Sequence, residues 1–164
     1  MSENVSKENV AARVLDAVMK GALLKDIHGV PDDVMEGIYA FAFDSYNKGQ
    51  LQQAEEFFRF LCLYDFRNAD YMMGLAAVFQ LQQRYQQAAD LYTVTYALSK
   101  NDFRPVFHAG QCHLSLGKVG KARQYFEMVA MQCRDQSLRD QAQAYLDALA
   151  DAKTSKIEAV EDDN

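Results

Sequence analysis

The feature that most constrains this chain is a spacing of 34 residues that recurs along it. Ala54, Ala88 and Ala122 follow one another at this interval. Three further sets keep the same step: Phe58, Tyr92 and Phe126; Ala42, Ala76 and Gly110; Ile38, Met72 and Val106. A repeat of this length indicates one supersecondary unit used several times, with neighbouring units stacked so that each completes the core of the next.

Helical periodicity fills each of these units. Apolar positions predict helices at about 8–20, 33–48, 51–65, 69–82, 85–98, 103–116, 119–132 and 138–150. The chain contains only 2 Pro and 8 Gly, which leaves few sites for β-turns. We therefore expect an all-α protein. Gly49 and Gly117 suit helix ends, whereas the middle repeat has Gln83 there, so we expect that helix end to lack an αL glycine.

A helix-turn-helix unit of 34 residues with small residues at its helix crossings resembles the tetratricopeptide repeat. The resemblance implies three repeats, at 35–68, 69–102 and 103–136, in a right-handed superhelical array with a concave groove. An N-terminal helical segment, 1–34, precedes residues 35–136 of the array. A capping helix is expected at 137–151. Residues 152–164 are polar and acidic, and we expect them to form a disordered tail.

Composition narrows the classes of function. The net charge of −6 comes from 23 acidic and 17 basic residues, and much of the excess lies in the last fourteen residues. No basic patch stands out, so direct nucleic-acid binding is not expected. No apolar run approaches the roughly 20 residues that span a bilayer, and the start, MSENVSKENV, lacks an apolar signal region. We expect a cytoplasmic protein without membrane insertion.

Cys62, Cys112 and Cys133 are interpreted as buried thiols.

The stretch IYAFAFDSY carries two apolar stripes where an ordinary surface helix needs one. Ile38, Phe41, Ala42 and Ser45 occupy the packing positions of the first repeat. In a tetratricopeptide array the first helix of each repeat lines the groove, which leaves a second stripe of Tyr39, Phe43 and Tyr46 facing it. A step of 34 residues extends this predicted groove to Met73, Ala77, Gln80, Phe107, Gln111 and Leu114. Such a surface suits an extended segment with spaced apolar side chains.

Other interpretations of these residues remain open. The stripe of Tyr39, Phe43 and Tyr46 could instead be covered by the chain's own N-terminal helix or belong to the core. A clamp for a C-terminal carboxylate needs Lys and Asn in the first repeat, where Tyr39 and Phe43 stand, and only Arg104 and His108 in the third repeat are compatible. A nucleophilic site would have to use His108, Cys112 and His113, which we interpret as packing residues. We expect no enzyme, no metal and no cofactor.

Beyond the repeat, four runs resemble the class II chaperones of type III secretion systems, over roughly residues 10–150: LKDIHGVPDDVMEGIY, AEEFFRFLCLYDF, DYMMGLAAVFQL and KNDFRPVFHAGQCHL. The resemblance implies a cytoplasmic chaperone that binds N-terminal segments of hydrophobic translocator proteins in its groove. It keeps them soluble and apart before export. In the enteric branch it also implies an AraC-type transcription activator as a partner. The alternative is a tetratricopeptide adaptor or scaffold for another cytoplasmic protein.

The N-terminal helix has one apolar side, formed by Val10, Val14, Ala17 and Val18. A helix this short is marginally stable alone. Because members of the resembled family often associate through this region, we expect these residues to form a homodimer interface.

Overall fold

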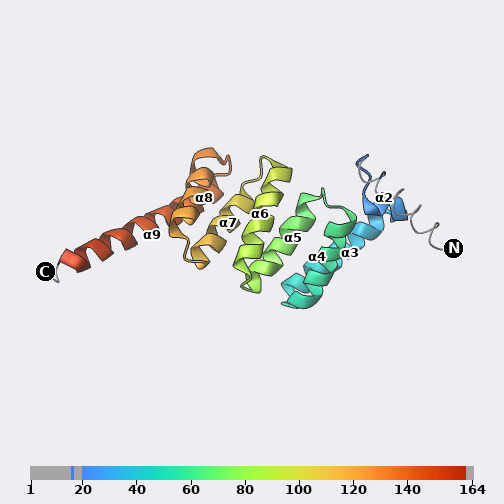
Figure 1. Ribbon diagram of the computed structural model, residues 1–164, viewed down its shortest axis with the longest axis horizontal. Helices are drawn as coiled ribbons and strands as arrows, with labels where there is room; N and C mark the ends of the chain where they lie inside the picture. Colours follow the sequence, from blue (N-terminus) through green and yellow to red (C-terminus); the bar gives the residue numbers. More distant parts are fainter. Residues whose placement is uncertain (1–15, 17–19, 162–164) are drawn as a thin grey trace, which may run out of the picture. The chain divides into compact units, whose positions relative to one another are not determined.

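The computed structural model describes Asp16 and residues 20–161, with side chains described as far as residue 152. In these residues all regular structure is helical, which confirms the expected all-α class. The helices are α2 (Leu24–His28), α3 (Asp32–Asn47), α4 (Leu51–Tyr64), α5 (Ala69–Leu81), α6 (Tyr85–Ser99), α7 (Arg104–Ser115), α8 (Val119–Gln132) and α9 (Gln136–Glu161) (Figure 1). The expected interface residues Val10, Val14, Ala17 and Val18 lie outside the described residues.

The chain divides into two compact units, residues 1–71 and 72–164. In the first unit α3 and α4 pack together as a hairpin, and α2 lies against α4. In the second unit α6 packs on α7, α7 on α8, and α8 on α9. Each helix of this series therefore covers the next, as expected for a stack in which no pair closes its own core.

Most of the residues that repeat every 34 positions lie in the core of the two units, and Ile38 and Met72 are half-buried. The small residues Ala42, Ala54, Ala76, Ala88 and Ala122 are fully buried, and the aromatic set Phe58, Tyr92 and Phe126 is at most 1% exposed. Small side chains let two helices approach, and the aromatic rings fill the space that remains. The periodic positions thus have the packing role that the sequence predicted.

The turns inside the helix pairs share one geometry. Gly49, Gln83 and Gly117 all have left-handed backbone, with φ of 72°, 60° and 71°. In each turn this residue and the next donate backbone hydrogen bonds to the end of the preceding helix; Gln83 N bonds Gln80 O at 3.0 Å, and Arg84 N bonds Phe79 O at 2.9 Å. The middle helix pair thus ends its first helix without glycine, and Gln83 itself takes the left-handed conformation because the paired capping bonds hold the turn.

Two helices differ from the expected boundaries. The five-residue helix α2 was not predicted, because it is too short to show periodicity. Helix α9 continues to Glu161 instead of ending near residue 151, so helix replaces the first ten residues of the expected disordered tail. Residues 136–161 contain no Gly or Pro that would stop a helix. Of the helices that the structure describes, none is long and apolar enough to cross a membrane.

Candidate functional site

Three aromatic side chains form a continuous row along α3. The rings of Tyr39 and Phe43 stack with centroids 6.3 Å apart, and Phe43 and Tyr46 stack at the same centroid distance. Phe43 is 49% exposed, and both tyrosines are partly exposed. These three residues, Tyr39, Phe43 and Tyr46, are called the aromatic row, and contiguous exposed apolar surface of this kind marks binding sites. The predicted second stripe therefore exists as a surface.

One end of the aromatic row is fixed by the core of the first unit. The ring of Tyr39 meets Phe58 edge to face at 6.0 Å and lies 5.5 Å from the ring of Tyr71. Phe58 and Tyr71 are 1% and 8% exposed. Tyr39 is thus both a packing residue and a surface residue, whereas Phe43 contributes mainly surface.

The predicted packing stripe of α3 is only partly correct. Ala42 and Ser45 are buried and Ile38 is half-buried, but Phe41 is 48% exposed and meets Phe57 edge to face at 5.0 Å. Met35, which is not part of the predicted stripe, is 1% exposed. The buried side of α3 follows Met35, Ala42 and Ser45, a spacing of seven and three residues, and this helical spacing could have identified Met35.

The groove positions predicted for the second unit fall into two groups. Met73, Ala77, Gln80, Gln111 and Leu114 are partly exposed. Phe107 is only 4% exposed and belongs to the core. Its ring lies 5.7 Å from Phe126 and 5.7 Å from Tyr145, and those two rings stack on each other at 4.6 Å. The assignment of Phe107 to an open groove is therefore corrected, because α9 brings Tyr145 over it.

Two of the predicted groove residues are joined directly by hydrogen bonds. Gln80 Nε2 donates to Gln111 Oε1 at 3.4 Å, and Gln111 Nε2 donates to Tyr145 Oη at 3.0 Å. Tyr92 Oη donates to Gln80 Oε1 at 2.8 Å, and His108 Nδ1 lies 2.9 Å from Gln111 Oε1. An amide oxygen only accepts, so His108 carries its proton on Nδ1 in this arrangement. The network fixes polar side chains of α5, α6, α7 and α9 against one another.

The three residues considered for nucleophilic chemistry are packing residues. Cys112 is fully buried, and burial raises the pKa of its thiol to about 12. His113 is 2% exposed, and burial lowers its pKa. Burial also lowers the pKa of His108, which is engaged with Gln111. A protonated, enclosed thiol is a poor nucleophile, so the arrangement offers no activated group.

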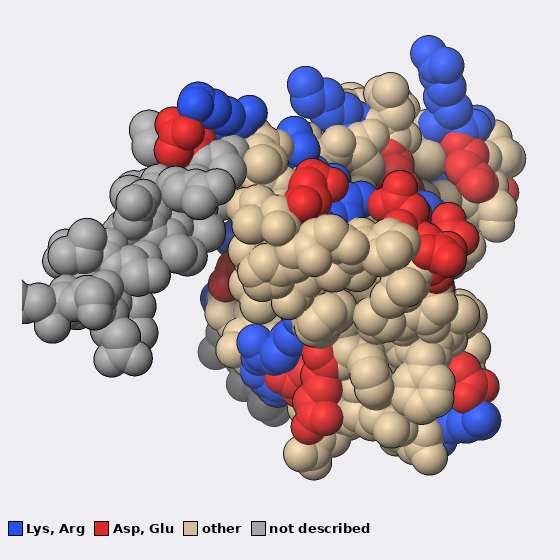
Figure 2. All heavy atoms as spheres, turned by 90° about the vertical axis from the view of Figure 1, so that its right-hand side faces the viewer, with Lys and Arg blue, Asp and Glu red and all other residues tan. Residues whose placement is uncertain are grey.

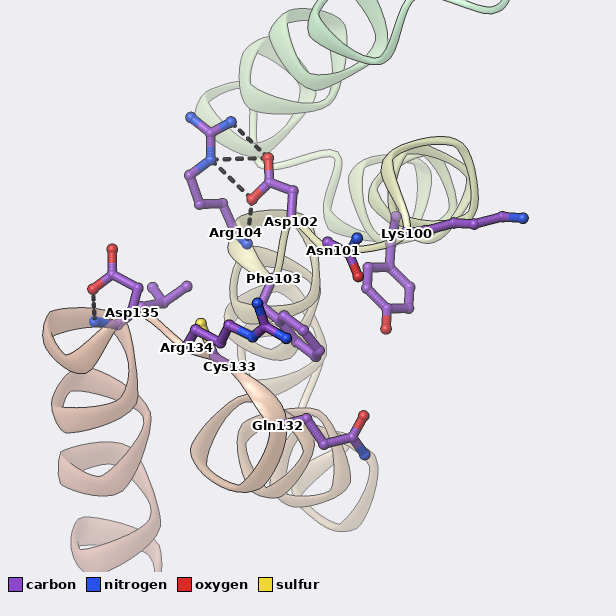
Figure 3. Close-up of a pocket in the computed structure, with 11 residues that line it drawn as sticks. Lys100, Asn101, Asp102, Phe103, Arg104, Gln132, Cys133, Arg134 and Asp135 are labelled. Carbon is purple, nitrogen blue, oxygen red and sulfur yellow. Dashed lines mark hydrogen bonds and ion pairs between the residues drawn. The ribbon is translucent and has the colours of Figure 1, made fainter.

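A separate cavity of about 510 Å³ lies between the loop joining α6 to α7 and the loop joining α8 to α9 (Figure 3). Asp102 accepts hydrogen bonds from Arg104 Nε at 2.9 Å and Nη2 at 2.6 Å. Asp135 accepts one from the backbone N–H of Leu138 at 3.1 Å, at the start of α9. These carboxylates hold the loops, and no predicted groove residue lines the cavity.

Comparison with known proteins places this arrangement in a family. The profile described as Tetratricopeptide repeat matches residues 35–68 and 69–102, the bounds expected for the first two repeats. The chain is 56% identical to "Chaperone protein SicA" of Salmonella typhimurium over 153 residues, 93% of each protein.

Two solved structures show the same fold. PcrH of Pseudomonas aeruginosa, in complex with the chaperone binding region of PopD, is 33% identical with a TM-score of 0.70, covering 76% of this chain and 97% of PcrH. The Yersinia enterocolitica type III secretion translocator chaperone SycD, in an alternative dimer, is 26% identical with a TM-score of 0.69, covering 76% of this chain and 97% of SycD. With its repeats, its all-helical fold and these relatives, the chain belongs to the class II chaperones of type III secretion systems.

Proposed function

We propose that this chaperone binds an extended N-terminal segment of a hydrophobic translocator protein on the aromatic row of α3. The observation that carries the proposal is the row itself, with Phe43 half exposed between two stacked tyrosines. Its relative PcrH is seen with the chaperone binding region of PopD, which supports a peptide segment as the ligand.

The chemistry of the row suits such a segment. Rings exposed in a line offer apolar contact to spaced side chains of an extended peptide, and the tyrosine hydroxyls can bond its backbone. A protein destined for a membrane carries apolar segments that aggregate in water. A chaperone that covers a short segment of its client keeps the client soluble without folding it.

The partly exposed residues of the second unit are proposed as further client contacts. They are Met73, Ala77, Gln80, Gln111 and Leu114. Gln80 and Gln111 are held by their hydrogen-bond network, so their amides present fixed polar groups. Pre-organised groups lose less entropy on binding than mobile ones.

Co-expression with the translocators of the bacterium's own secretion system tests the function. We expect an otherwise insoluble translocator to become soluble and to copurify with the chaperone. A translocator that stays insoluble with the well-folded chaperone would contradict the proposal and favour an adaptor for another cytoplasmic protein. The AraC-type partner and the cytoplasmic location remain predictions.

The chain offers a matched pair of variants for locating the surface. Phe43 and Phe41 lie two residues apart on α3 and are 49% and 48% exposed, but only Phe43 belongs to the aromatic row. We expect Phe43→Ala to weaken binding of the translocator segment by about 2 kcal/mol, roughly thirtyfold, as for an anchor residue. Phe41→Ala should change the affinity less than twofold. Equal effects in calorimetric titration would remove the row from the binding surface.

Self-association is proposed through Val10, Val14, Ala17 and Val18, which lie outside the described residues. The alternative dimer of SycD supports a homodimer in this family. Removing residues 1–20 should convert a dimer to a monomer in sedimentation equilibrium, and an unchanged mass would refute this interface.

A further inference from the structure

A second cavity, of about 360 Å³, lies in the first unit beside the aromatic row. Its lining includes three carboxylates, one ammonium group and two phenol rings, from Asp32, Glu36, Asp70, Lys25, Tyr39 and Tyr71. Tyr39 belongs to both the aromatic row and this acidic cavity. A ligand held on the row therefore has direct access to the carboxylates.

The ammonium group of Lys25 does not neutralise the cavity. Its Nζ lies 3.0 Å from Asp32 Oδ1 and 3.0 Å from Asp65 Oδ2. Asp65 is 8% exposed, so Lys25 already compensates a buried charge and joins α2 to the end of α4. Within the described residues Glu36 and Asp70 have no ion-pair partner. Figure 2 shows acidic side chains, with basic ones among them, beside a broad uncharged area.

One phenol of the cavity lining leaves its hydroxyl accessible from the cavity. Tyr71 is 8% exposed and lines the acidic cavity, yet its hydroxyl makes no hydrogen bond to any group in the described part of the chain. Burial raises the pKa of this phenol, the carboxylates of Asp65, Asp32 and Glu36 raise it further, and the ammonium group of Lys25 opposes them. The hydroxyl thus lies in a negative field, with an oxygen able to accept a hydrogen bond from a cation.

The arrangement suits a large organic cation better than a metal ion. Among the described residues no three metal-ligating side chains are close enough to share an ion. The rings of Tyr39 and Tyr71, 5.5 Å apart and inclined at 40°, offer the aromatic faces that attract ammonium and guanidinium groups. A basic side chain would satisfy the phenol and the unpaired carboxylates together.

We propose that the acidic cavity receives a lysine or arginine side chain of the segment that binds the aromatic row. This inference rests on the proposed function and adds a charge requirement to it. Neighbouring rings of the row are 6.3 Å apart. That distance is close to the roughly 6.6 Å between same-side residues of an extended chain. Because Tyr39 borders both the row and the cavity, the basic residue lies close in sequence to the first apolar anchor of the client.

The test uses the client segment mapped by limited proteolysis of the copurified complex. The double variant Glu36→Gln, Asp70→Asn removes the unpaired carboxylates of the cavity. The control Asp44→Asn, Glu56→Gln removes as much charge from exposed positions of the first unit, where Asp44 is ion-paired with Lys48. We expect about tenfold weaker binding and a shallower salt dependence for the first, and less than twofold change for the control. Tyr71→Phe, which keeps the buried ring, should weaken binding about threefold.

A peptide series completes the test. Replacing one basic residue of the segment by Gln should weaken binding to the unchanged chaperone about tenfold and leave binding to the Glu36→Gln, Asp70→Asn variant unchanged. Additive losses, or equal affinities for all peptides, would overturn the charge requirement. Phe43→Ala separates the two proposals. If Phe43→Ala weakens binding and the Glu36→Gln, Asp70→Asn variant does not, the aromatic row remains the binding surface and the role of the acidic cavity is refuted.

Discussion

The ring of Phe126 on α8 lies so close to Gly110 on α7 that an added Cβ would stand 2.9 Å from Phe126 Cε1. Phe126 is fully buried, and the ring of Tyr145 stacks on it with centroids 4.6 Å apart. The ring therefore has little freedom to move. The approach of α7 to α8 depends on the absence of a side chain at position 110.

Replacing Gly110 by alanine should destabilise the protein by about 1–3 kcal/mol through overpacking, although alanine favours helix. Gly120→Ala in α8 is the matched control, since a Cβ there meets nothing within 4 Å. That control should stabilise by up to about 1 kcal/mol. Urea unfolding of both variants gives the comparison, and a stabilised Gly110→Ala would show that the ring can move.

The helix pairs were predictable because one pattern is repeated. Helices α4, α6 and α7 begin and end within one residue of their expected bounds, since the breaks between them recur with the 34-residue step. Helix α2 could not be predicted, because five residues are too few to show helical periodicity. Helix α9 runs past residue 151 because no Gly or Pro stops it, and polar composition alone does not distinguish a solvated helix from a disordered tail.

The site was less predictable than the fold. The spacing of Tyr39, Phe43 and Tyr46 places them on one face, and the structure brings their rings together. Phe107 could not be assigned by analogy with the first repeat, because its burial depends on Tyr145 of the capping helix. The acidic cavity joins α2, α3 and the start of α5, so no single helix pattern reveals it.

Gln83 is a natural site for stabilisation. Its φ of 60° costs about 1–2 kcal/mol for a residue with a Cβ, and glycine stands at the equivalent positions 49 and 117. Gln83→Gly should stabilise the protein by about 0.5 kcal/mol, the strain relief less the added entropy of the unfolded chain. Gln52→Gly, in the exposed first turn of α4, should destabilise it instead. Thermal unfolding of both variants measures the difference, and a loss of stability in Gln83→Gly would mean that its side chain outweighs the strain.

Phe58 and Phe41 should separate core from surface in the first unit. Phe58 is 1% exposed, so Phe58→Ala should cost about 3–5 kcal/mol. Phe41 is 48% exposed and loses mainly its contact with Phe57, so Phe41→Ala should cost about 1 kcal/mol or less. Chemical denaturation followed by circular dichroism checks both values. Similar losses would indicate that the exposed face of α3 is covered in solution, for example by a second copy.

His113 should make stability depend on pH. Its Nδ1 is buried without a hydrogen-bond partner among the described residues, and its ring lies 5.0 Å from that of Tyr125. Burial lowers its pKa, Lys121 and Lys118 lower it further, and Asp90 opposes them. The folded state thus keeps a neutral imidazole at a pH where the unfolded chain, with an ordinary pKa near 6.5, already binds a proton. Stability must fall as the pH drops below about 6.5, by at most about 1.4 kcal/mol per pH unit for this group.

The variant His113→Leu removes both the titrating group and the unpaired nitrogen. At pH 7.5, where histidine is neutral in both states, it should stabilise the protein by about 1 kcal/mol, because no buried polar atom is left unpaired. Between pH 6.5 and 5 the advantage over the unchanged protein should widen, since only the unchanged protein loses stability at this position. Contributions of His108 and of the carboxylates to the pH dependence cancel in the difference between the two unfolding free energies, because both proteins contain these groups. A difference that stays constant over this range would show that His113 is accessible to protons in the folded state.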